Sequence, residues 1–475
     1  KGNILEAAKY YKDYIIQGFK NHIAYANYGA ILQDLGYLKE AELSTRKAIK
    51  LNPNYAVGYS NLGNILKELG NLKEAELSTR KAIDLNPNYA DAYYNLGNIL
   101  KELGNLKDAE LSQRKSIELN PNFAEAHYNL GNLLGNLGKL KEAESFQRKA
   151  IELKPDFAMA HYNLGNLLGN LGRGEEAMIH RKKAVELKPK DERLVLGLAH
   201  DLFNKGKYEL ALKYLRKNES NSCQSLYLGC LLSLDREKDF NEMYKDLSKK
   251  KSCNADIGGI VEHANIIYGK KYESPFCNES IKYIFIDKID KKSFSENDLN
   301  ELISYNKVSK KEHRAQGLIN NGIQTSGNLF DLDYPFIKAM RKALEMKIEK
   351  YKQEFKNSGQ GFINNWPENY ELRSWMISMK TGGFLKSHNH EYGWITGSFY
   401  LQIPKYDNEN NNDSGNIAFS YQGPRYPKKN KSFNLTVKKI ETRDICIFPS
   451  SLFHHTIPFK SKEDRICFVF DLVQK

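Results

Sequence analysis

A strict period of 34 residues runs through the N-terminal part of the chain and constrains its fold more than any other feature. Prolines recur at this interval at Pro53, Pro87, Pro121, Pro155 and Pro189. Glycines recur at the same interval at Gly36, Gly70, Gly104, Gly138, Gly172 and Gly206. A period of this length indicates one supersecondary unit that is stacked many times, because a single unit cannot bury its own apolar face.

Each repeated unit contains two segments with apolar residues at helical spacing. In the second complete unit we predict a first helix over residues 59–69 that ends at Gly70, where glycine tolerates a left-handed backbone. A second helix over residues 72–85 ends before Pro87, because proline cannot continue a helix. Ala75 lies on this second helix, where a small side chain lets neighbouring helices approach closely.

The unit resembles the tetratricopeptide repeat (TPR). The matching positions are Tyr59, Leu62, Gly63, Ala75, Ala82 and Pro87. Thr79 departs from the family pattern, which usually has an aromatic residue there, as do Gln113 and Gln147 in later repeats. The resemblance implies an all-α superhelical solenoid with a concave groove for a protein or peptide partner.

The phase of the repeat predicts the domain organisation. Gly2 lies 34 residues before Gly36, so the chain begins inside a repeat, and we expect it to be a fragment or processed form of a longer protein. We predict TPR repeats over residues 1–219 and degenerate or capping helices over residues 220–276. A different domain, with no trace of the period, is predicted over residues 277–475.

One asparagine in each repeat is a candidate substrate-binding residue. These residues are Asn27, Asn61, Asn95, Asn129 and Asn163. The repeats are similar to those of the O-linked N-acetylglucosamine transferase, whose asparagines at this position hold the backbone of an extended peptide. An amide group both donates and accepts, so it can pair with any peptide backbone. The alternative is that these side chains bond only within the solenoid.

From about residue 370 the pattern changes to short alternating runs that are broken by Gly, Pro and Asn, which indicates the strands of a sandwich or barrel. His388 and His390 are two residues apart, so on a strand they point to the same face. A later strand can bring His454 to the same place. Imidazoles that converge in this way suit Fe, Zn, Cu or Ni.

An arginine follows on the last predicted strand. Arg465 lies eleven residues after His454 and shares its strand face with Cys467, Val469 and Asp471. The planar guanidinium matches a carboxylate in a bidentate manner. We therefore expect an anionic co-substrate close to the metal.

The two histidine clusters and Arg465 together resemble the 2-oxoglutarate/Fe(II) oxygenases over about residues 324–472. The resemblance implies a double-stranded β-helix (jelly-roll or cupin-like) core at about residues 370–475. The predicted fold class is therefore multidomain α + β, with an N-terminal all-α TPR solenoid before this barrel.

The same resemblance implies the roles of the site residues. His388 and His454 match the iron ligands, and Arg465 matches the residue that anchors the far carboxylate of 2-oxoglutarate. Tyr400 matches a tyrosine that contacts this carboxylate in prolyl hydroxylases. The implied cofactor and co-substrates are Fe(II), 2-oxoglutarate and O2, and the implied catalytic residues are His388, His454 and Arg465.

The third metal ligand departs from the family motif, which has a carboxylate where this chain has His390. Three options stay open: His390 is a neutral third ligand, Glu391 reaches the metal through a bulge, or only His388 and His454 bind it. The aspartyl/asparaginyl β-hydroxylases also lack the carboxylate and carry TPR-like repeats. This parallel fits a two-histidine or a three-histidine iron and does not choose between them.

The function implied by the resemblance is a 2-oxoglutarate/Fe(II)-dependent dioxygenase that hydroxylates a protein or peptide held in the TPR groove. One alternative is an inactive TPR scaffold with a relic barrel. Another is a three-histidine iron dioxygenase that does not use 2-oxoglutarate. A glycosyltransferase, suggested only by the repeats, is not expected, because the sequence has no glycine-rich nucleotide loop.

Composition narrows the partners and the compartment. The net charge is +13, but the excess is mostly Lys on predicted helix surfaces, so nucleic acid is not an expected partner. No apolar run is long enough to span a membrane, so no membrane partner is expected. The six cysteines include no CxxC pair, which favours a reducing, cytoplasmic location.

Overall fold

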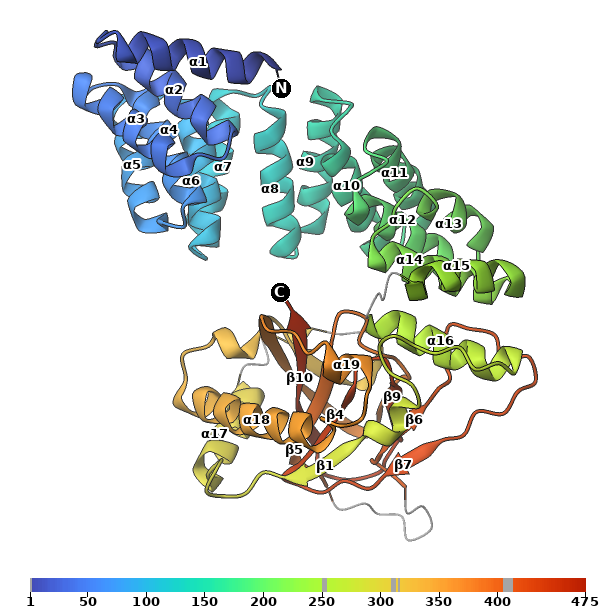
Figure 1. Cartoon of the computed structure of the whole chain (residues 1–475). Helices are drawn as coiled ribbons and strands as arrows, with labels where there is room; N and C mark the ends of the chain where they lie inside the picture. The colour runs from blue at the N-terminus through green and yellow to red at the C-terminus, as the bar shows by residue number, and fades with distance from the viewer. Residues whose placement is uncertain (1, 250–253, 309–312, 315–316, 405–412) are drawn as a thin grey trace. The chain divides into compact units, whose positions relative to one another are not determined.

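The computed structural model describes residues 2–249, 254–308, 313–314, 317–404 and 413–475, in two compact units. The first unit is Lys1–Leu198 and the second is Ala199–Lys475 (Figure 1). The domain limits that we place from the sequence at 219/220 and 276/277 stay predictions. The two units are described separately below.

The first unit consists of antiparallel helix pairs that stack side by side, drawn in blue to teal in Figure 1. Its helices are α1 (Gly2–Ile16), α2 (His22–Asp34), α3 (Leu38–Leu51), α4 (Ala56–Glu68), α5 (Leu72–Leu85), α6 (Ala90–Glu102), α7 (Leu106–Leu119), α8 (Ala124–Asn136), α9 (Leu140–Leu153), α10 (Ala158–Asn170) and α11 (Gly174–Leu187). The next helix, α12 (Glu192–Asn204), crosses the boundary between the units.

Glycines make the turn inside each helix pair, as the sequence predicts. Gly36 and Gly70 adopt φ of +83° and +81°, and the later members of the series stay between +69° and +80°. The helix that precedes each of them ends two residues earlier. A left-handed backbone is strained for residues with a side chain, so the 34-residue glycine period follows directly from the turn geometry.

A second glycine series brings the two helices of a pair into close contact. A Cβ atom on Gly63 would overlap the Thr79 hydroxyl, and one on Gly97 would overlap the Gln113 side chain. Gln113 folds back onto the first helix and donates from Nε2 to the Tyr94 carbonyl at 3.1 Å. The polar residues at the usual aromatic position therefore still connect the two helices.

Ion pairs join adjacent repeats along the solenoid. Arg46 pairs with Glu74 of the next repeat at 2.5 Å, and Arg114 pairs with Glu142 at 2.8 Å. These side chains are largely exposed, so each pair stabilises the solenoid by at most about 1 kcal/mol. Stability in the first unit is thus spread over many similar nearest-neighbour interfaces.

The second unit begins with helices and continues into two β-sheets. Its helices and 3-10 turns are α13 (Tyr208–Leu215), α14 (Asn221–Ser233), α15 (Glu237–Lys249), α16 (Ala255–Tyr268), η1 (Ser280–Tyr283), α17 (Glu296–Val308), η3 (Leu329–Asp331), α18 (Pro335–Glu354) and α19 (Gly361–Asn364). Its strands are β1 (Phe285–Lys288), β2 (His313–Arg314), β3 (Ile319–Thr325), β4 (Tyr370–Leu385), β5 (Ile395–Gln402), β6 (Ile417–Ser420), β7 (Thr436–Lys438), β8 (Asp444–Pro449), β9 (Phe453–Thr456) and β10 (Arg465–Gln474).

The described strands form a seven-stranded sheet in the order β1-β8-β5-β10-β4-β3-β2 and a three-stranded sheet in the order β7-β6-β9. The pairings between these strands are antiparallel. An isolated antiparallel bridge also joins His388 to His454. A helical solenoid that is followed by an antiparallel β-sandwich confirms the predicted fold class.

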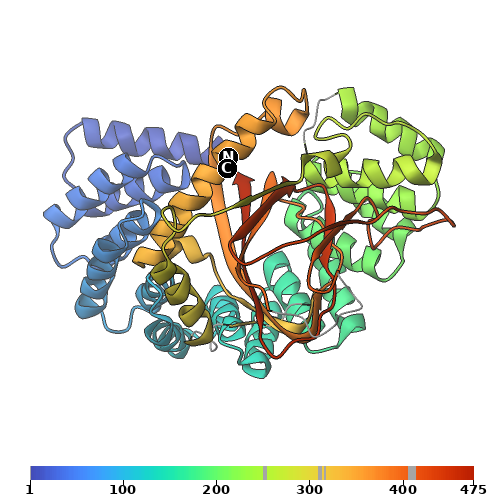
Figure 2. The same cartoon turned by 90° about the horizontal axis from the view of Figure 1, so that it is seen from below.

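The strand β10 shows how the large sheet separates two cores. Ile466, Phe468 and Phe470 point to one face, where they pack in a cluster with residues of α17, α18 and α19. Figure 2 shows the ribbon of α18, in light orange, running beside the sheet. Cys467 and Val469 point to the other face, toward residues of the small sheet. This alternation is the one that the sequence predicts for the strand that carries Arg465.

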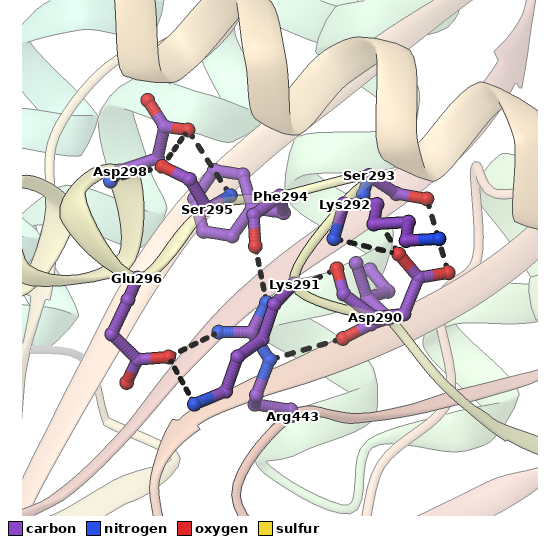
Figure 3. Close-up of polar contacts among 10 residues, drawn as sticks. Asp290, Lys291, Lys292, Ser293, Phe294, Ser295, Glu296, Asp298 and Arg443 are labelled. Carbon is purple, nitrogen blue, oxygen red and sulfur yellow. Dashed lines mark hydrogen bonds and ion pairs between the residues drawn. The ribbon is translucent and has the colours of Figure 1, made fainter.

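The edge of the large sheet is fixed by Arg443 (Figure 3). Its guanidinium donates to the carbonyls of Ile289 at 3.1 Å and Asp290 at 3.2 Å, and also to that of Phe294. It also pairs with Glu296, at the start of α17, at 3.3 Å. One side chain therefore ties the whole segment between β1 and α17 to the beginning of β8.

The helix α16 packs against the loop that follows β6. His263 donates from Nε2 to the Pro427 carbonyl at 3.1 Å, and its Nδ1 accepts from the Gly423 amide at 3.1 Å. Glu262, the preceding residue, accepts from the Ser280 amide at 2.7 Å and hydroxyl at 2.6 Å. Burial raises the pKa of Glu262 to about 8. The helix α16 is therefore packed into the second unit by contacts on both sides.

Candidate active site

Three histidines of the second unit meet at one point. His388 and His390 follow β4, and His454 lies in β9. One ring nitrogen from each of the three side chains lies within 4.8 Å of the others, which is a spacing at which the three could hold one metal ion. The predicted cluster of His388, His390 and His454 is thus brought together.

The backbone sets the positions of two of these residues. His388 donates its amide to the His454 carbonyl at 3.1 Å, and His454 donates its amide to the His388 carbonyl at 2.9 Å. Residues that exchange both bonds lie directly opposite each other on paired strands. The third histidine follows two residues after the first, and its amide donates to the Ser450 carbonyl at 3.1 Å.

Hydrogen bonds fix which nitrogen of each ring carries the proton. His388 Nδ1 lies 2.8 Å from the Lys386 carbonyl, and His454 Nδ1 lies 3.3 Å from the Leu452 carbonyl. A carbonyl only accepts, so both rings carry hydrogen on Nδ1 and a lone pair on Nε2 when neutral. His390 Nδ1 lies 2.7 Å from a carboxylate oxygen of Asp471, which assigns the same tautomer to the third ring.

The Nε2 atoms of His388 and His390 face each other, and neither carries a hydrogen in these tautomers. His388 Nε2 and His390 Nε2 are 3.2 Å apart. In the assigned tautomer each has a lone pair, so the contact is repulsive until a cation lies between them. Metal–imidazole bonds of about 2.0–2.1 Å are compatible with this separation. The donor set therefore fits a transition metal such as iron.

The environment keeps the rings of His388 and His454 in the neutral form. Burial lowers the pKa of His388 to about 3, with a further contribution from the neighbouring His390 ring. Burial, followed by the proximity of His388 and His390, places the pKa of His454 well below its usual range. Neutral imidazole is the form that binds metal, so neither ring has to lose a proton near neutral pH.

Arg465 and Tyr400 lie in the same cavity as the histidines. Arg465 is 2% exposed, donates from Nε to the Gly415 carbonyl at 3.0 Å and has its guanidinium carbon 5.1 Å from the centre of the Tyr400 ring. Among the described residues, no carboxylate forms an ion pair with it, and Tyr400 is buried beside it. A buried cation without a carboxylate partner fits an anionic ligand.

The cavity has a volume of about 830 Å³, which is in the range of sites that hold small molecules. Apolar side chains such as Trp375, Ile377 and Val469 form much of its wall. Trp375 also stacks on His390, with ring centres 5.9 Å apart and planes 17° apart. The cavity therefore combines nitrogen ligands, one buried cation and a largely apolar wall.

Charged and polar residues from distant segments also line the cavity. Asn389 donates to the Asp256 carboxyl at 3.4 Å, and Arg425 pairs with Glu391 at 3.4 Å. Burial raises the pKa of Asp256 to about 7, and the nearby Glu391 contributes to this rise. Successive residues of the segment 388–391 thus alternate: His388 and His390 join the histidine cluster, whereas Asn389 and Glu391 contact Asp256 and Arg425. Glu391 lies outside the cluster of nitrogen ligands.

Sequence reasoning missed the contact between His390 and Asp471 and the contribution of Asp256. The face that Asp471 shares with Arg465 could have indicated the first, because β10 then points both residues into the cavity. No local signal indicates the second, because Asp256 and Asn389 are 133 residues apart in the chain.

The five asparagines predicted to hold a peptide are placed at equivalent positions of the first helix in their pairs. Asn27 donates to the Tyr11 hydroxyl at 3.0 Å, and Asn95 donates to the Ser60 hydroxyl at 3.1 Å. Asn129 donates to Asn98 at 2.9 Å and Asn163 donates to Asn132 at 2.7 Å, while Asn61 is partly buried. Bonds within the solenoid therefore use part of the capacity of these amides.

Across the described part of the chain, no helix has both the length and the apolar character that crossing a membrane requires.

Models of known families match a stretch of each of the two units. The family model described as “Putative 2OG-Fe(II) oxygenase” matches residues 373–471, which contain the three histidines, Tyr400, Arg465 and Asp471. Models of TPR repeats match residues 22–55, 45–76, 63–104, 97–138, 124–157 and 158–191. No curated protein sequence matches the chain.

Solved structures of TPR proteins are similar to part of the chain. YrrB, described as a TPR protein with an unusual peptide-binding site, is 29% identical over 42% of this chain and 98% of its own, with a TM-score of 0.32. MamA is 28% identical over 34% of this chain and 94% of its own, with a TM-score of 0.31. TTC0263, a thermophilic TPR protein in Thermus thermophilus, is 24% identical over 38% of this chain and 98% of its own, with a TM-score of 0.34.

The repeat matches and the oxygenase match agree with the helix pairs and the histidine-lined sandwich that the structure contains. The chain therefore combines N-terminal tetratricopeptide repeats with a C-terminal region, residues 373–471, that matches the family described as “Putative 2OG-Fe(II) oxygenase”.

Proposed function

We propose that this chain is a 2-oxoglutarate- and Fe(II)-dependent dioxygenase that hydroxylates a protein or peptide held by its TPR groove. One observation carries the proposal: three imidazole nitrogens converge in the same cavity as a buried arginine that has no carboxylate partner among the described residues. A metal and an anionic co-substrate would satisfy both features at once.

The metal ligands in this proposal are His388, His390 and His454. His390 is preferred to Glu391 because its ring joins the cluster, whereas the Glu391 carboxylate is paired with Arg425. Iron(II), when bound, supplies the activation of O2 that couples oxidative decarboxylation to hydroxylation. The balanced reaction is R–H + 2-oxoglutarate + O2 → R–OH + succinate + CO2, in which one atom of O2 enters R–OH and the other enters succinate.

Arg465 and Tyr400 are proposed to bind the far carboxylate of 2-oxoglutarate. The guanidinium would donate two parallel hydrogen bonds, and the Tyr400 hydroxyl would donate one. The ring of Tyr400 and the Gly415 carbonyl hold the guanidinium in place. Apolar residues of the wall, such as Ile377, would exclude water from the reacting atoms.

The TPR groove is proposed to hold an extended protein or peptide substrate through Asn27, Asn61, Asn95, Asn129 and Asn163. An amide carries two N–H groups and one carbonyl oxygen. A single internal bond, such as that from Asn95 to the Ser60 hydroxyl, therefore leaves capacity for pairing with a peptide backbone. The internal bond also fixes the orientation of the amide before the peptide arrives, which lowers the entropy cost of binding.

The test measures anaerobic binding of Fe(II) and of 2-oxoglutarate, followed by succinate release in air. We expect His454→Ala to lose metal binding and Arg465→Ala to keep the metal but bind 2-oxoglutarate about 100-fold more weakly, because a buried charge pair is lost. His455→Ala is the matched control and should behave as wild type, since this neighbouring histidine lies outside the cluster.

The same assay tests the groove with a synthetic library of random-sequence peptides. Peptides should raise succinate release by the wild-type chain and should acquire one oxygen atom by mass spectrometry. The double variant Asn95→Ala/Asn129→Ala should need higher peptide concentrations. A wild-type protein that binds no iron and releases no succinate would leave an inactive scaffold with a relic barrel.

A second candidate function is favoured by His390 itself. Its place in the cluster makes the site a three-histidine site rather than the usual two-histidine, one-carboxylate site, which also fits an iron dioxygenase independent of 2-oxoglutarate. O2 consumption that requires iron but is unchanged by 2-oxoglutarate would select this candidate.

A further inference from the structure

We infer that Asp471 is a positioning residue that orients His390 and supplies, through one hydrogen bond, the negative charge missing from the ligand set. The inference rests on the proposed iron site and deepens it. It assigns a role to a residue that is not itself a ligand and explains why a third imidazole can stand where a carboxylate is usual.

The three ligands differ in what lies behind them. His388 and His454 donate from Nδ1 to neutral main-chain carbonyls, at 2.8 Å and 3.3 Å. His390 donates to the Asp471 carboxylate at 2.7 Å. Bonds between an imidazole and a carboxylate are stronger than those to a neutral carbonyl. His390 is therefore the most firmly oriented and the most electron-rich donor of the three.

Asp471 is itself held in a fixed position. It lies in β10 between β4 and β5, where it is opposite Arg373 and Thr396. The Thr396 hydroxyl donates to the same Asp471 oxygen at 2.7 Å and lies 2.7 Å from the Ser450 hydroxyl. Because Thr396 donates its hydrogen to Asp471, Ser450 must donate to Thr396. A chain of oriented hydroxyls thus ends on the carboxylate.

The His390 ring is restrained from both sides. The side chains of His390 and Asp471 are only 8% and 13% exposed, so little water competes for their hydrogen bond. Trp375 stacks on the ring at 5.9 Å between centres, which opposes rotation about the bond to the ring. His390 Nε2 is therefore aimed at His388 Nε2 before any metal arrives.

Charge explains why this arrangement is useful. Three neutral imidazoles would leave the full double positive charge of Fe(II) uncompensated in a largely apolar cavity. A carboxylate one hydrogen bond away lowers this net charge by one and favours metal binding, although it touches no metal. Removing such a partner typically costs 10- to 100-fold in metal affinity.

The experiment compares two variants that separate charge from orientation. Asp471→Asn keeps an oxygen that can accept from His390 and Thr396, so it removes only the charge. Asp471→Ala removes charge and acceptor together. Asp444→Asn is the matched control, because Asp444 is another buried carboxylate of the same sheet, is paired with the Glu441 amide and does not line the cavity.

The readouts are anaerobic Co(II) and Fe(II) affinity and the long-range ¹H–¹⁵N NMR signals of the metal-free histidines. We expect affinity to fall about 10-fold in Asp471→Asn and about 100-fold in Asp471→Ala. The Nδ1–H tautomer of His390 should persist in Asp471→Asn and mix with the other tautomer in Asp471→Ala. Asp444→Asn should bind both metals as wild type does.

The outcomes separate this inference from the proposed function. Wild-type affinity in both Asp471 variants, with metal binding intact in the wild-type chain, would overturn the role of Asp471 and leave the iron site standing. If Asp471→Ala does not fold, the affinity of Asp471→Asn decides the question. Absence of metal binding by the wild-type chain would overturn the iron site and this inference together.

Discussion

The two units of this protein use buried polar side chains over very different distances along the chain. In the repeat unit, Gln113 reaches the Tyr94 carbonyl 19 residues away, and Asn163 reaches Asn132 31 residues away. In the second unit, His390 meets Asp471 across 81 residues, and Asn389 meets Asp256 across 133. A destabilising substitution should therefore affect only nearby helices in the repeats but the whole β-sandwich in the second unit.

The largest expected effect comes from a glycine in the sandwich. A Cβ on Gly397, in β5, would overlap the buried Phe470 ring and press on the Cys446 carbonyl. Neither group can move freely, so we expect Gly397→Ala to destabilise the second unit by about 3 kcal/mol. Denaturant unfolding should show this loss, and the affinity for Co(II) should fall with it.

Gly135→Ala in the repeats is the matched control for this change. Its new Cβ would meet only the Ala143 side chain, at an ordinary contact distance of 3.9 Å, and alanine is the better helix former by about 1 kcal/mol. The net change should stay within about 1 kcal/mol and leave metal binding untouched. Equal losses in the two variants would contradict the difference between the units.

The next effect is a pH dependence of opposite sign in the two units. Burial raises the pKa of Glu262 to about 8, so the folded second unit keeps a proton that the unfolded chain releases above about pH 4.5. Its stability should therefore fall as pH rises toward 8. A hydrogen bond from Lys139 lowers the pKa of Glu110 in the repeats, where stability should instead fall as pH drops below about 4.5.

Glu262→Gln tests this prediction, because glutamine stays neutral and can still bond to the Ser280 amide and hydroxyl. Between about pH 6 and pH 7.5 the wild-type unit should lose about 2 kcal/mol of stability that the variant keeps. Chemical denaturation at several pH values measures the difference. Parallel pH profiles for wild type and variant would show that Glu262 is ionised in the folded protein.

The smallest change in stability is expected from replacing one asparagine of the series. Asn163→Ala removes hydrogen bonds to Asn132 at 2.7 Å and to the Tyr128 hydroxyl at 3.2 Å. The expected cost is about 1 kcal/mol. Faster hydrogen exchange should be confined to α8–α11, since the main helix–helix contacts of the solenoid join neighbouring repeats. Faster exchange in β4 or β10 would argue against this independence.

The difference between short-range contacts in the repeats and long-range contacts in the second unit also decides what the sequence could predict. Helix pairs were predictable because a turn glycine such as Gly70 and a closing proline such as Pro87 act within a few residues. The convergence of His388, His390 and His454 followed from strand parity and the resemblance to a family. The same alternation of side chains along a strand predicted that Asp471 and Arg465 point to the same face of β10.

What escaped prediction depends on contacts between distant segments. Parity showed that Asp471 points into the cavity, but it could not show that its oxygen lies 2.7 Å from His390. The role of α16 in lining the cavity through Asp256 has no periodic or compositional signature. Such contacts arise only when the strands and helices assemble, because no local propensity encodes them.

The self-contained repeat has a consequence for the evolution of the gene. Each unit of 34 residues carries its own turn glycine, its own closing proline and one asparagine of the series. Unequal recombination between the DNA segments that encode them can therefore insert or delete one whole repeat and recreate the same junction on both sides. The solenoid can lengthen or shorten by one asparagine of the series at a time, while the sandwich keeps every residue of its site.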